Sequence, residues 1–222
     1  MSSSILGLLV IHLGYMKISL IVIVVVVIVW SLWGYLSSRV EQTEYIVLEK
    51  TDDYEIRNYP AHIVAQTTVT GPYREALGQG FSIVAGYIFG GNTKNESISM
   101  TAPVVEQKSL SQSIAMTAPV TANIEGDSHT IAFGMPRSYT LATLPTPTDS
   151  RVTLVEIPAR KIAAKRFYLY RTDDRVQSKK EELLSSLAKD KIDVIGEPQY
   201  AGYNAPWTPP WMMRNEVLIE IR

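Results

Sequence analysis

The feature that most constrains this chain is an uninterrupted apolar run near its N-terminus. Residues Ile18 to Leu36 read ISLIVIVVVVIVWSLWGYL and include no charged side chain. These 19 residues approach the roughly 20 that a helix needs to cross the hydrocarbon core of a bilayer. In water a Val/Ile run favours a strand, but in lipid each backbone polar group must be satisfied within the segment, which favours a helix. We therefore predict a transmembrane anchor over residues 18–36.

A cleaved signal peptide is the alternative interpretation of this run. Signal peptides usually have an apolar region of about 7–15 residues followed by a small-residue cleavage site. The run is longer than that, and residues 34–38 (GYLSS) make a poor cleavage site. An uncleaved anchor is therefore favoured, with residues 1–17 as an N-terminal extension and residues 37–43 as a linker.

The charges that flank the anchor are Lys17 on one side and Arg39 on the other. Because this difference in basic residues is small, it indicates only a preferred orientation. We expect a single-pass membrane protein whose N-terminus is inside and whose body is extracytoplasmic.

The composition of the body excludes several classes of function. Without Lys17 and Arg39, the 21 basic residues fall to 19 against 22 acidic residues, so a nucleic-acid-binding surface is not expected. The absence of cysteine excludes disulfides, thiolate metal sites and a cysteine nucleophile. The chain also lacks the G-x-S-x-G, P-loop and dinucleotide motifs. We therefore predict that this protein is not an enzyme.

The body shows the order strand, helix, strand, strand twice. The first set comprises strand-like segments at 45–48, 54–59 and 62–70, a helix between Gly71-Pro72 and Gly90-Gly91, and further strands at 98–106, 114–122 and 129–135. The second set comprises strands at 152–157 and 161–170, a helix capped by Asp174, and strands at 199–203 and 216–221. The sequence YPAHIVAQ at 59–66 also resembles IPARKIAA at 157–164.

This repetition predicts an α+β fold built from duplicated βαββ units. Two helices would pack on a curved, mainly antiparallel sheet related by a pseudo-twofold axis. In the segment 62–70, Ala65 and Val69 would share one face with Ile63 and Thr67, while His62 and Val64 would share the other with Gln66 and Thr68. A cleft between the halves would be a common type of ligand site.

A shorter repeat, MTAPV, occurs at 100–104 and again at 116–120. Because proline lacks a ladder donor, these segments are expected to form neighbouring edges or a bulged hairpin. Met100 and Met116 could offer thioethers to a haem iron, although methionines that fill a core are the favoured interpretation.

Four motifs occur in an order that resembles the SOUL haem-binding family. They are YEIRNYP (54–60), YIFGGN (87–92), MTAPV and AGYNAPW…RNEV (201–217), and the resemblance covers residues 44–222. It implies a distorted, half-open antiparallel β-barrel of two βαββ units with two helices. It also implies that the protein binds haem or another tetrapyrrole without catalysis.

The resemblance gives several candidate binding residues. The position of a proposed family haem ligand is Asn58 here, and an amide does not serve as an ordinary axial ligand. The family's basic positions for propionates align with Gly78, Gly86 and Thr208, so apolar contacts remain. The candidates are therefore Asn58, a helix face of Gly78, Ser82 and Ala85, and a loop containing Tyr203, Trp207, Trp211 and Met212.

The histidines and a basic run complete the candidates. His62 is a weak candidate for an axial ligand, because a single histidine is more often a solvated group. His129 follows a Gly-Asp-Ser turn, so we expect it to face solvent. A run of basic residues interleaved with aromatic residues could contact propionates or headgroups, although a solvated strand edge is favoured: Arg160, Lys161, Lys165, Arg166, Arg171 and Arg175.

The sequence therefore predicts a membrane-anchored protein that binds haem, another tetrapyrrole or a similar flat hydrophobic molecule in an open cleft. The expected partners are that ligand and the membrane, with no nucleic acid and no identifiable protein. The alternative is an interaction module that docks a protein at the membrane surface without a ligand.

Overall fold

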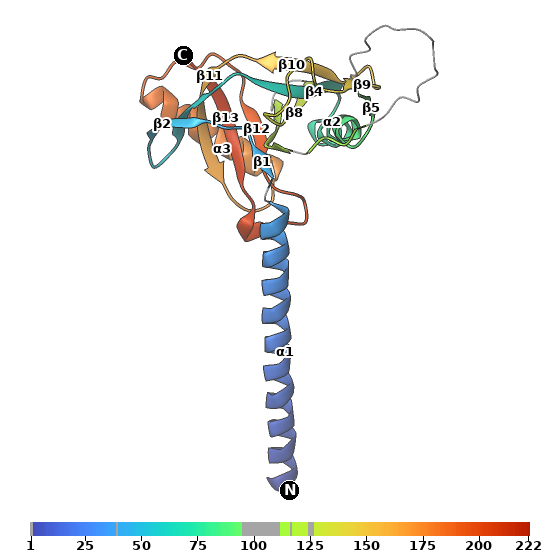
Figure 1. Ribbon diagram of the computed structural model, residues 1–222. Coiled ribbons are helices and arrows are strands. Elements are labelled where there is room, and N and C mark those ends of the chain that lie inside the picture. Colours follow the sequence, from blue (N-terminus) through green and yellow to red (C-terminus); the bar gives the residue numbers. More distant parts are fainter. Residues whose placement is uncertain (1, 39, 95–111, 116, 124–126) are drawn as a thin grey trace, which may run out of the picture.

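The computed structural model describes residues 2–38, 40–94, 112–115, 117–123 and 127–222, with side chains from residue 14 onward. Helix α1 (Ser2–Ser37) projects from a body that contains the remaining elements (Figure 1). Its segment Gly14–Ser37, 24 residues, has the length and composition of a membrane-spanning helix. Large apolar side chains such as Val22 and Ile28 are more than half exposed, which is unfavourable in water but compatible with lipid.

The body is organised around one curled antiparallel sheet of nine strands in the order β10-β4-β8-β7-β12-β13-β11-β3-β2. The strands are β2 (Ile46–Lys50), β3 (Glu55–Tyr59), β4 (His62–Thr70), β7 (Val120–Asn123), β8 (Ser128–Gly134), β10 (Thr153–Ile157), β11 (Arg160–Phe167), β12 (Gln199–Gly202) and β13 (Asn215–Ile221). Two minor pairs accompany it: β1 (Glu41–Gln42) with β6 (Thr117–Ala118), and β5 (Asn92–Thr93) with β9 (Thr146–Pro147). The predicted α+β class and half-barrel sheet are confirmed.

Two helices cover the convex face of this sheet. Helix α2 (Tyr73–Ile88) packs on β4 and β8, and α3 (Asp173–Lys189) packs on β11 and β13. Gly80 allows α2 to approach β8 closely, because a Cβ there would lie 2.5 Å from Cδ1 of Ile131. The apolar side chains of β4 that face α2 include Ala65 and Val69, as their alternation predicted.

The order of the strands in the sheet is symmetric when residues 59–66 are aligned with residues 157–164. This alignment makes β3 correspond to β10 and β4 to β11, and the order of the strands along the chain then matches β7 with β12 and β8 with β13. The eight strands from β10 to β3 then read the same in either direction, and α2 and α3 cover corresponding pairs. At the centre, Ala122 of β7 pairs with Tyr200 of β12.

Several predicted boundaries are wrong. The cap of α3 is Thr172, whose hydroxyl accepts a hydrogen bond from the Arg175 amide at 3.2 Å, and Asp174 lies in the first turn. The strand predicted at 161–170 ends at Phe167, because Leu169 adopts a φ of 71°. The strand predicted at 114–122 is divided at Pro119, which cannot donate to a ladder. The strand predicted at 98–106 and both candidate methionines, Met100 and Met116, lie outside the described residues.

Candidate functional site

The concave face of the sheet encloses a cavity of about 330 Å³. Its walls come from strands at both ends of the sheet order, because the sheet curls. The lining residues are Thr43, Tyr59, His62, Val64, Gln66, Pro119, Thr121, Asn123, Thr130, Ala132, Gly134, Ile157, Arg160, Ile162, Glu197, Gln199 and Leu218. This mixture of apolar and uncharged polar groups, with few ionisable ones, suits an amphipathic small molecule.

Corresponding residues of the two halves line this cavity in pairs. His62 at the start of β4 corresponds to Arg160 at the start of β11, and both line the cavity. Val64 and Ile162 lie two residues further along these strands, correspond in the same alignment, and also line the cavity. The segments 59–66 and 157–164, which are similar in sequence, therefore form two walls of one cavity.

A backbone contact determines which ring nitrogen of His62 carries the proton. Its Nδ1 lies 2.9 Å from the carbonyl oxygen of Pro60, and a carbonyl can only accept, so Nδ1 carries the proton. Burial lowers the pKa of His62, and the positive charge of Arg160 lowers it further. The ring is therefore neutral near pH 7, and its Nε2 is an unprotonated nitrogen available to a ligand.

Arg160 provides a hydrogen-bond donor that the protein does not use. One of its terminal nitrogens, Nη1, lies 3.4 Å from Oε2 of Glu220, which is a long contact. Within the described part of the chain, its Nε is buried and has no hydrogen-bond partner. The Arg160 side chain is 22% exposed and lines the cavity, so its terminal nitrogens are the donors that a ligand carboxylate would meet.

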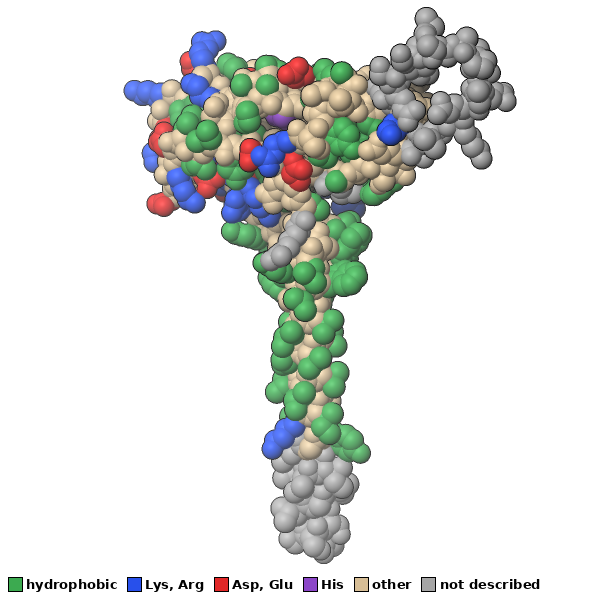
Figure 2. All heavy atoms as spheres, viewed as in Figure 1, with side chains coloured by type: hydrophobic (Ala, Val, Ile, Leu, Met, Phe, Trp, Pro, Cys, Tyr) green, Lys and Arg blue, Asp and Glu red, His purple; other side chains and the backbone are tan. Residues whose placement is uncertain are grey.

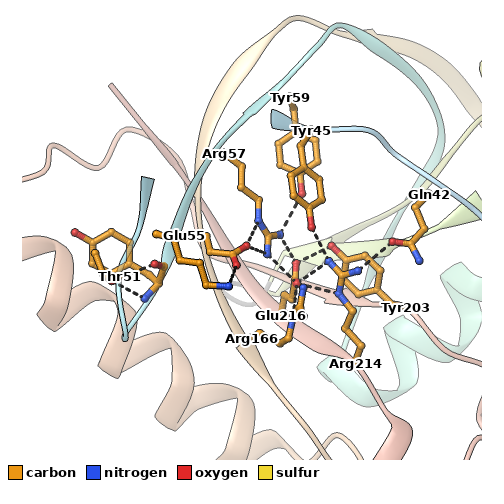
Figure 3. Close-up of polar contacts among 12 residues, drawn as sticks. Gln42, Tyr45, Thr51, Glu55, Arg57, Tyr59, Arg166, Tyr203, Arg214 and Glu216 are labelled. Atoms are coloured by element: carbon orange, nitrogen blue, oxygen red, sulfur yellow. Dashed lines mark hydrogen bonds and ion pairs between the residues drawn. The ribbon is translucent and has the colours of Figure 1, made fainter. Parts of the chain in front are cut away.

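The end of the concave face next to β2 and β3 is filled instead by a buried ionic network (Figure 3). Glu216 at its centre is fully buried and accepts a bidentate pair from Arg57, at 2.6 and 3.0 Å. The hydroxyl of Tyr203 donates to the same carboxylate at 2.7 Å. Arg166 and Arg214 complete the network, with nitrogen–oxygen distances of 3.3 and 2.9 Å.

The charge state of this network follows from its contacts. Burial alone raises the pKa of Glu216, but the hydrogen bonds and charge of Arg57, followed by the charge of Arg214, lower it more, to about 2. Arg214 also donates to Gln42 and Tyr45 in the segment that follows α1. The network therefore connects this segment to the C-terminal strand and closes one end of the concave face.

The structure places the predicted binding residues in four places: strand β3, helix α2, the buried ionic network, and the loop between β12 and β13. Asn58 lies between Arg57 and Tyr59 on β3 and faces the convex side, away from His62. On α2, Gly78 and Ser82 are exposed and Ala85 is buried. Tyr203 belongs to the buried network.

The remaining predicted residues lie in the loop between β12 and β13, which packs against α1. Trp207 and Trp211 are about half exposed there, and Met212 belongs to the short helix η1 (Pro210–Met212). On α2, the predicted positions Gly78 and Ser82 point away from the sheet, and a different face, which includes Ala76 and Gly80, packs on β4 and β8.

The sequence analysis did not single out Arg160, and it misplaced His129. Arg160 was one member of a basic run. His129 is 2% exposed on β8, with its ring centroid 5.1 Å from that of Tyr73, so the prediction that it faces solvent is wrong. Alternation with Ile131 and Phe133, both buried, could have revealed this position. Among the described residues, no group of three or more His, Asp or Glu side chains could hold a bare metal ion.

Comparison with known proteins gives one family and one fold. The family described as "SOUL heme-binding protein" matches residues 40–220. No curated protein sequence matches the chain.

Solved structures share the fold at low sequence identity. The C-terminal domain of EcmrR aligns with a TM-score of 0.54 and 9% identity over 76% of this chain and 98% of that domain. EcmrR in its complex with DNA aligns with a TM-score of 0.50 and 10% identity, over 76% of this chain and 57% of that chain. Identities this low show a shared fold alone.

Proposed function

Because this chain belongs to the SOUL heme-binding protein family, we propose that it binds haem or another tetrapyrrole in the concave cavity, without catalysis. The observation that carries this proposal is the juxtaposition of His62 and Arg160 in one hollow. A tetrapyrrole has a flat apolar ring with acidic side chains, and haem adds an iron that accepts a nitrogen ligand.

The groups that line the cavity fit each part of such a ligand. Nε2 of His62 would hold the iron, and the guanidinium of Arg160 would hold a propionate through its terminal nitrogens. Val64, Ile162 and Leu218 would contact the ring, with apolar burial stabilising the complex by about 25 cal/mol per Å² removed from water. Since 330 Å³ lies near the lower limit for ligand pockets, about 300–1,000 Å³, part of the ligand would extend through the opening.

Helix α1 would hold this binding domain at a membrane, with the body on the extracytoplasmic side. Its length and its exposed apolar side chains support the anchor, and the positions of Lys17 and Arg39 motivate the orientation. The symmetric strand order supports the further idea that the body arose by duplication of a βαββ unit. A pseudo-twofold axis would then pass through the Ala122–Tyr200 pair.

Haem titration into the full chain in lipid nanodiscs tests the binding proposal. We expect a saturable shift of the Soret band at micromolar haem. The His62→Ala variant should bind more weakly and show a different Soret position, because the axial nitrogen is lost. The matched control is Asn58→Ala, which changes a neighbouring residue on the opposite face and should leave the spectrum unchanged.

Two outcomes would contradict the proposal. The absence of a saturable Soret shift would exclude haem as the ligand. Equal effects of His62→Ala and Asn58→Ala would exclude the concave cavity as the site.

A second candidate function, docking of a protein partner, is favoured by the edge strand β2. Ile46 and Leu48 are 66% and 55% exposed on this outermost strand, where unpaired backbone groups can add a further strand. An Ile46→Lys variant should then lose a co-purifying partner from its native membrane while its haem titration is unchanged. Purification of the chain without any stoichiometric partner would argue against this function.

A further inference from the structure

The loop between β12 and β13 lies directly against α1. The indole Nε1 of Trp30 donates a 2.8 Å hydrogen bond to the backbone oxygen of Trp207. The rings of Trp30 and Trp211 meet edge to face at 5.3 Å. Gly34 permits close contact, because a Cβ there would lie 2.5 Å from Cδ of Pro209. The loop therefore reaches along α1 to the level of Trp30.

When Lys17 lies at one boundary of the hydrocarbon core, the level of Trp30 lies below the opposite surface of the membrane that α1 spans. Lys17 is the only charged residue of α1. A helix rises 1.5 Å per residue, so Lys17 and Trp30 are separated by about 20 Å along the axis, whereas the hydrocarbon core is about 30 Å thick. With Lys17 at one boundary of the core, Trp30 and the loop beside it lie up to about 10 Å inside the opposite boundary.

The chemistry of this loop is compatible with that depth. Residues 203–213 include no charged side chain, and prolines at 206, 209 and 210 remove three backbone donors. The amides of Thr208, Met212 and Met213 donate to carbonyl oxygens within the loop. The carbonyl of Trp207 is satisfied by Trp30. These bonds reduce the cost of placing backbone in lipid.

The exposed side chains of the loop are of the type enriched at membrane interfaces. Trp207 is 58% exposed and Trp211 is 49% exposed. Figure 2 shows apolar side chains along α1 that continue to the lower edge of the body where the helix enters it. Tryptophan favours the headgroup level, where an apolar ring and a polar N–H are both accommodated.

We propose that loop 205–213 inserts into the headgroup–acyl boundary of the bilayer that α1 spans. This second membrane contact holds the body in one orientation on the surface, in place of free rotation on a flexible tether. The inference rests on the proposed membrane anchoring by α1, and it is independent of the ligand.

Tryptophan quenching in phosphatidylcholine vesicles tests the insertion with the full chain. The protein contains four tryptophans, so a Trp30→Phe/Trp33→Phe variant reports on Trp207 and Trp211 alone. We expect a blue-shifted emission that lipids brominated at shallow acyl positions quench and that aqueous iodide does not. Quenching by iodide without quenching by bromolipid would overturn the proposal.

A thiol probe gives a second measurement that keeps the hydrogen bond between Trp30 and Trp207 intact. Because the chain has no cysteine, Trp211→Cys introduces a single thiol, and Ser150→Cys in the exposed turn before β10 is the matched control. In vesicles, we expect a membrane-impermeant maleimide to label position 211 much more slowly than position 150, and the two rates to become equal in denaturant. Equal rates in vesicles would contradict insertion.

Alkaline washing distinguishes this inference from the proposed anchor. Protein that stays with the vesicles but has an accessible loop retains the anchor and refutes the insertion. Protein released from the vesicles refutes the anchor and the insertion together.

Discussion

The two halves of the body use corresponding positions on the concave face in opposite ways. Thr68 and Thr130 form a hydroxyl pair at 3.1 Å in the first half. The corresponding pair in the second half is Arg166 and the fully buried Glu216. Arg57, which completes the ion pair with Glu216, corresponds to Val155 on β10. One half is therefore filled by charged side chains, and the other contributes small side chains to the cavity.

This difference shows how one backbone arrangement can serve two purposes. The order and pairing of the strands match in the two halves, so side-chain volume and charge decide where a hollow remains. A buried ion pair offers weak net stability but a strict geometry, because either partner alone would be a buried unpaired charge. We infer that the second half fixes the shape of the concave face and that the first half leaves the space in which a ligand binds.

The largest effect expected from this comparison follows removal of the central carboxylate. Glu216→Ala removes the buried carboxylate that Arg57, Arg166 and Arg214 share, and it leaves Arg57 with Glu55 as its carboxylate partner. The free energy of unfolding should therefore fall by about 3 kcal/mol. Thr130→Ala changes the corresponding position and should cost about 1 kcal/mol or less. Urea unfolding of both variants, in the same detergent, measures the difference. Similar losses in the two variants would show that the halves do not differ in this way.

Acid unfolding should depend on the same carboxylate. The pKa of Glu216 is about 2 in the folded protein and lies near its ordinary value of 4.5 in the unfolded chain. A lowered pKa stabilises the fold above pH 4.5, and this contribution, roughly 3 kcal/mol, is lost as the pH falls from 4.5 to 2. Urea unfolding at a series of pH values measures it. A Glu216→Gln variant should have a flatter profile over this window, and an equally steep profile would assign the acid sensitivity to other groups.

Filling the cavity should affect ligand binding more than stability. Ala132 lines the hollow at the position that corresponds to Leu218, so Ala132→Leu gives the first half the larger side chain of the second. We expect the haem affinity to fall at least tenfold, about 1.4 kcal/mol, with a smaller change in unfolding free energy. Gly78→Trp fills the predicted helix face instead, where a Cβ meets nothing within 4 Å, and should leave binding unchanged. If Gly78→Trp weakens haem binding and Ala132→Leu does not, the ligand binds on α2 and not in the cavity.

The sequence was sufficient for the features that depend on local pattern. The alternation in residues 62–70 predicted both faces of β4. The apolar run predicted α1. In each case neighbouring residues along one element carry the whole signal.

The features that the sequence did not predict depend on contacts between distant residues. Arg57 and Glu216 are 159 positions apart, and only the strand register brings them together. Trp30 and Trp207 are 177 apart. His62 and Arg160 occupy the same position in the similar segments 59–66 and 157–164, but only the curl of the sheet brings them into one cavity. Local patterns specify faces of strands, whereas the site arises where two such faces meet.

The smallest effect expected concerns the coupling between the two halves at the cavity. Burial lowers the pKa of His62 and the charge of Arg160 lowers it further, so Arg160→Ala should raise it towards the ordinary value. The imidazole resonances of His62, followed by NMR against pH, report this shift. Arg166→Ala removes a cation on the same strand that belongs to the buried network, and it should leave the His62 titration unchanged. If Arg160→Ala also leaves it unchanged, the two walls do not interact electrostatically, and a ligand would have to contact them independently.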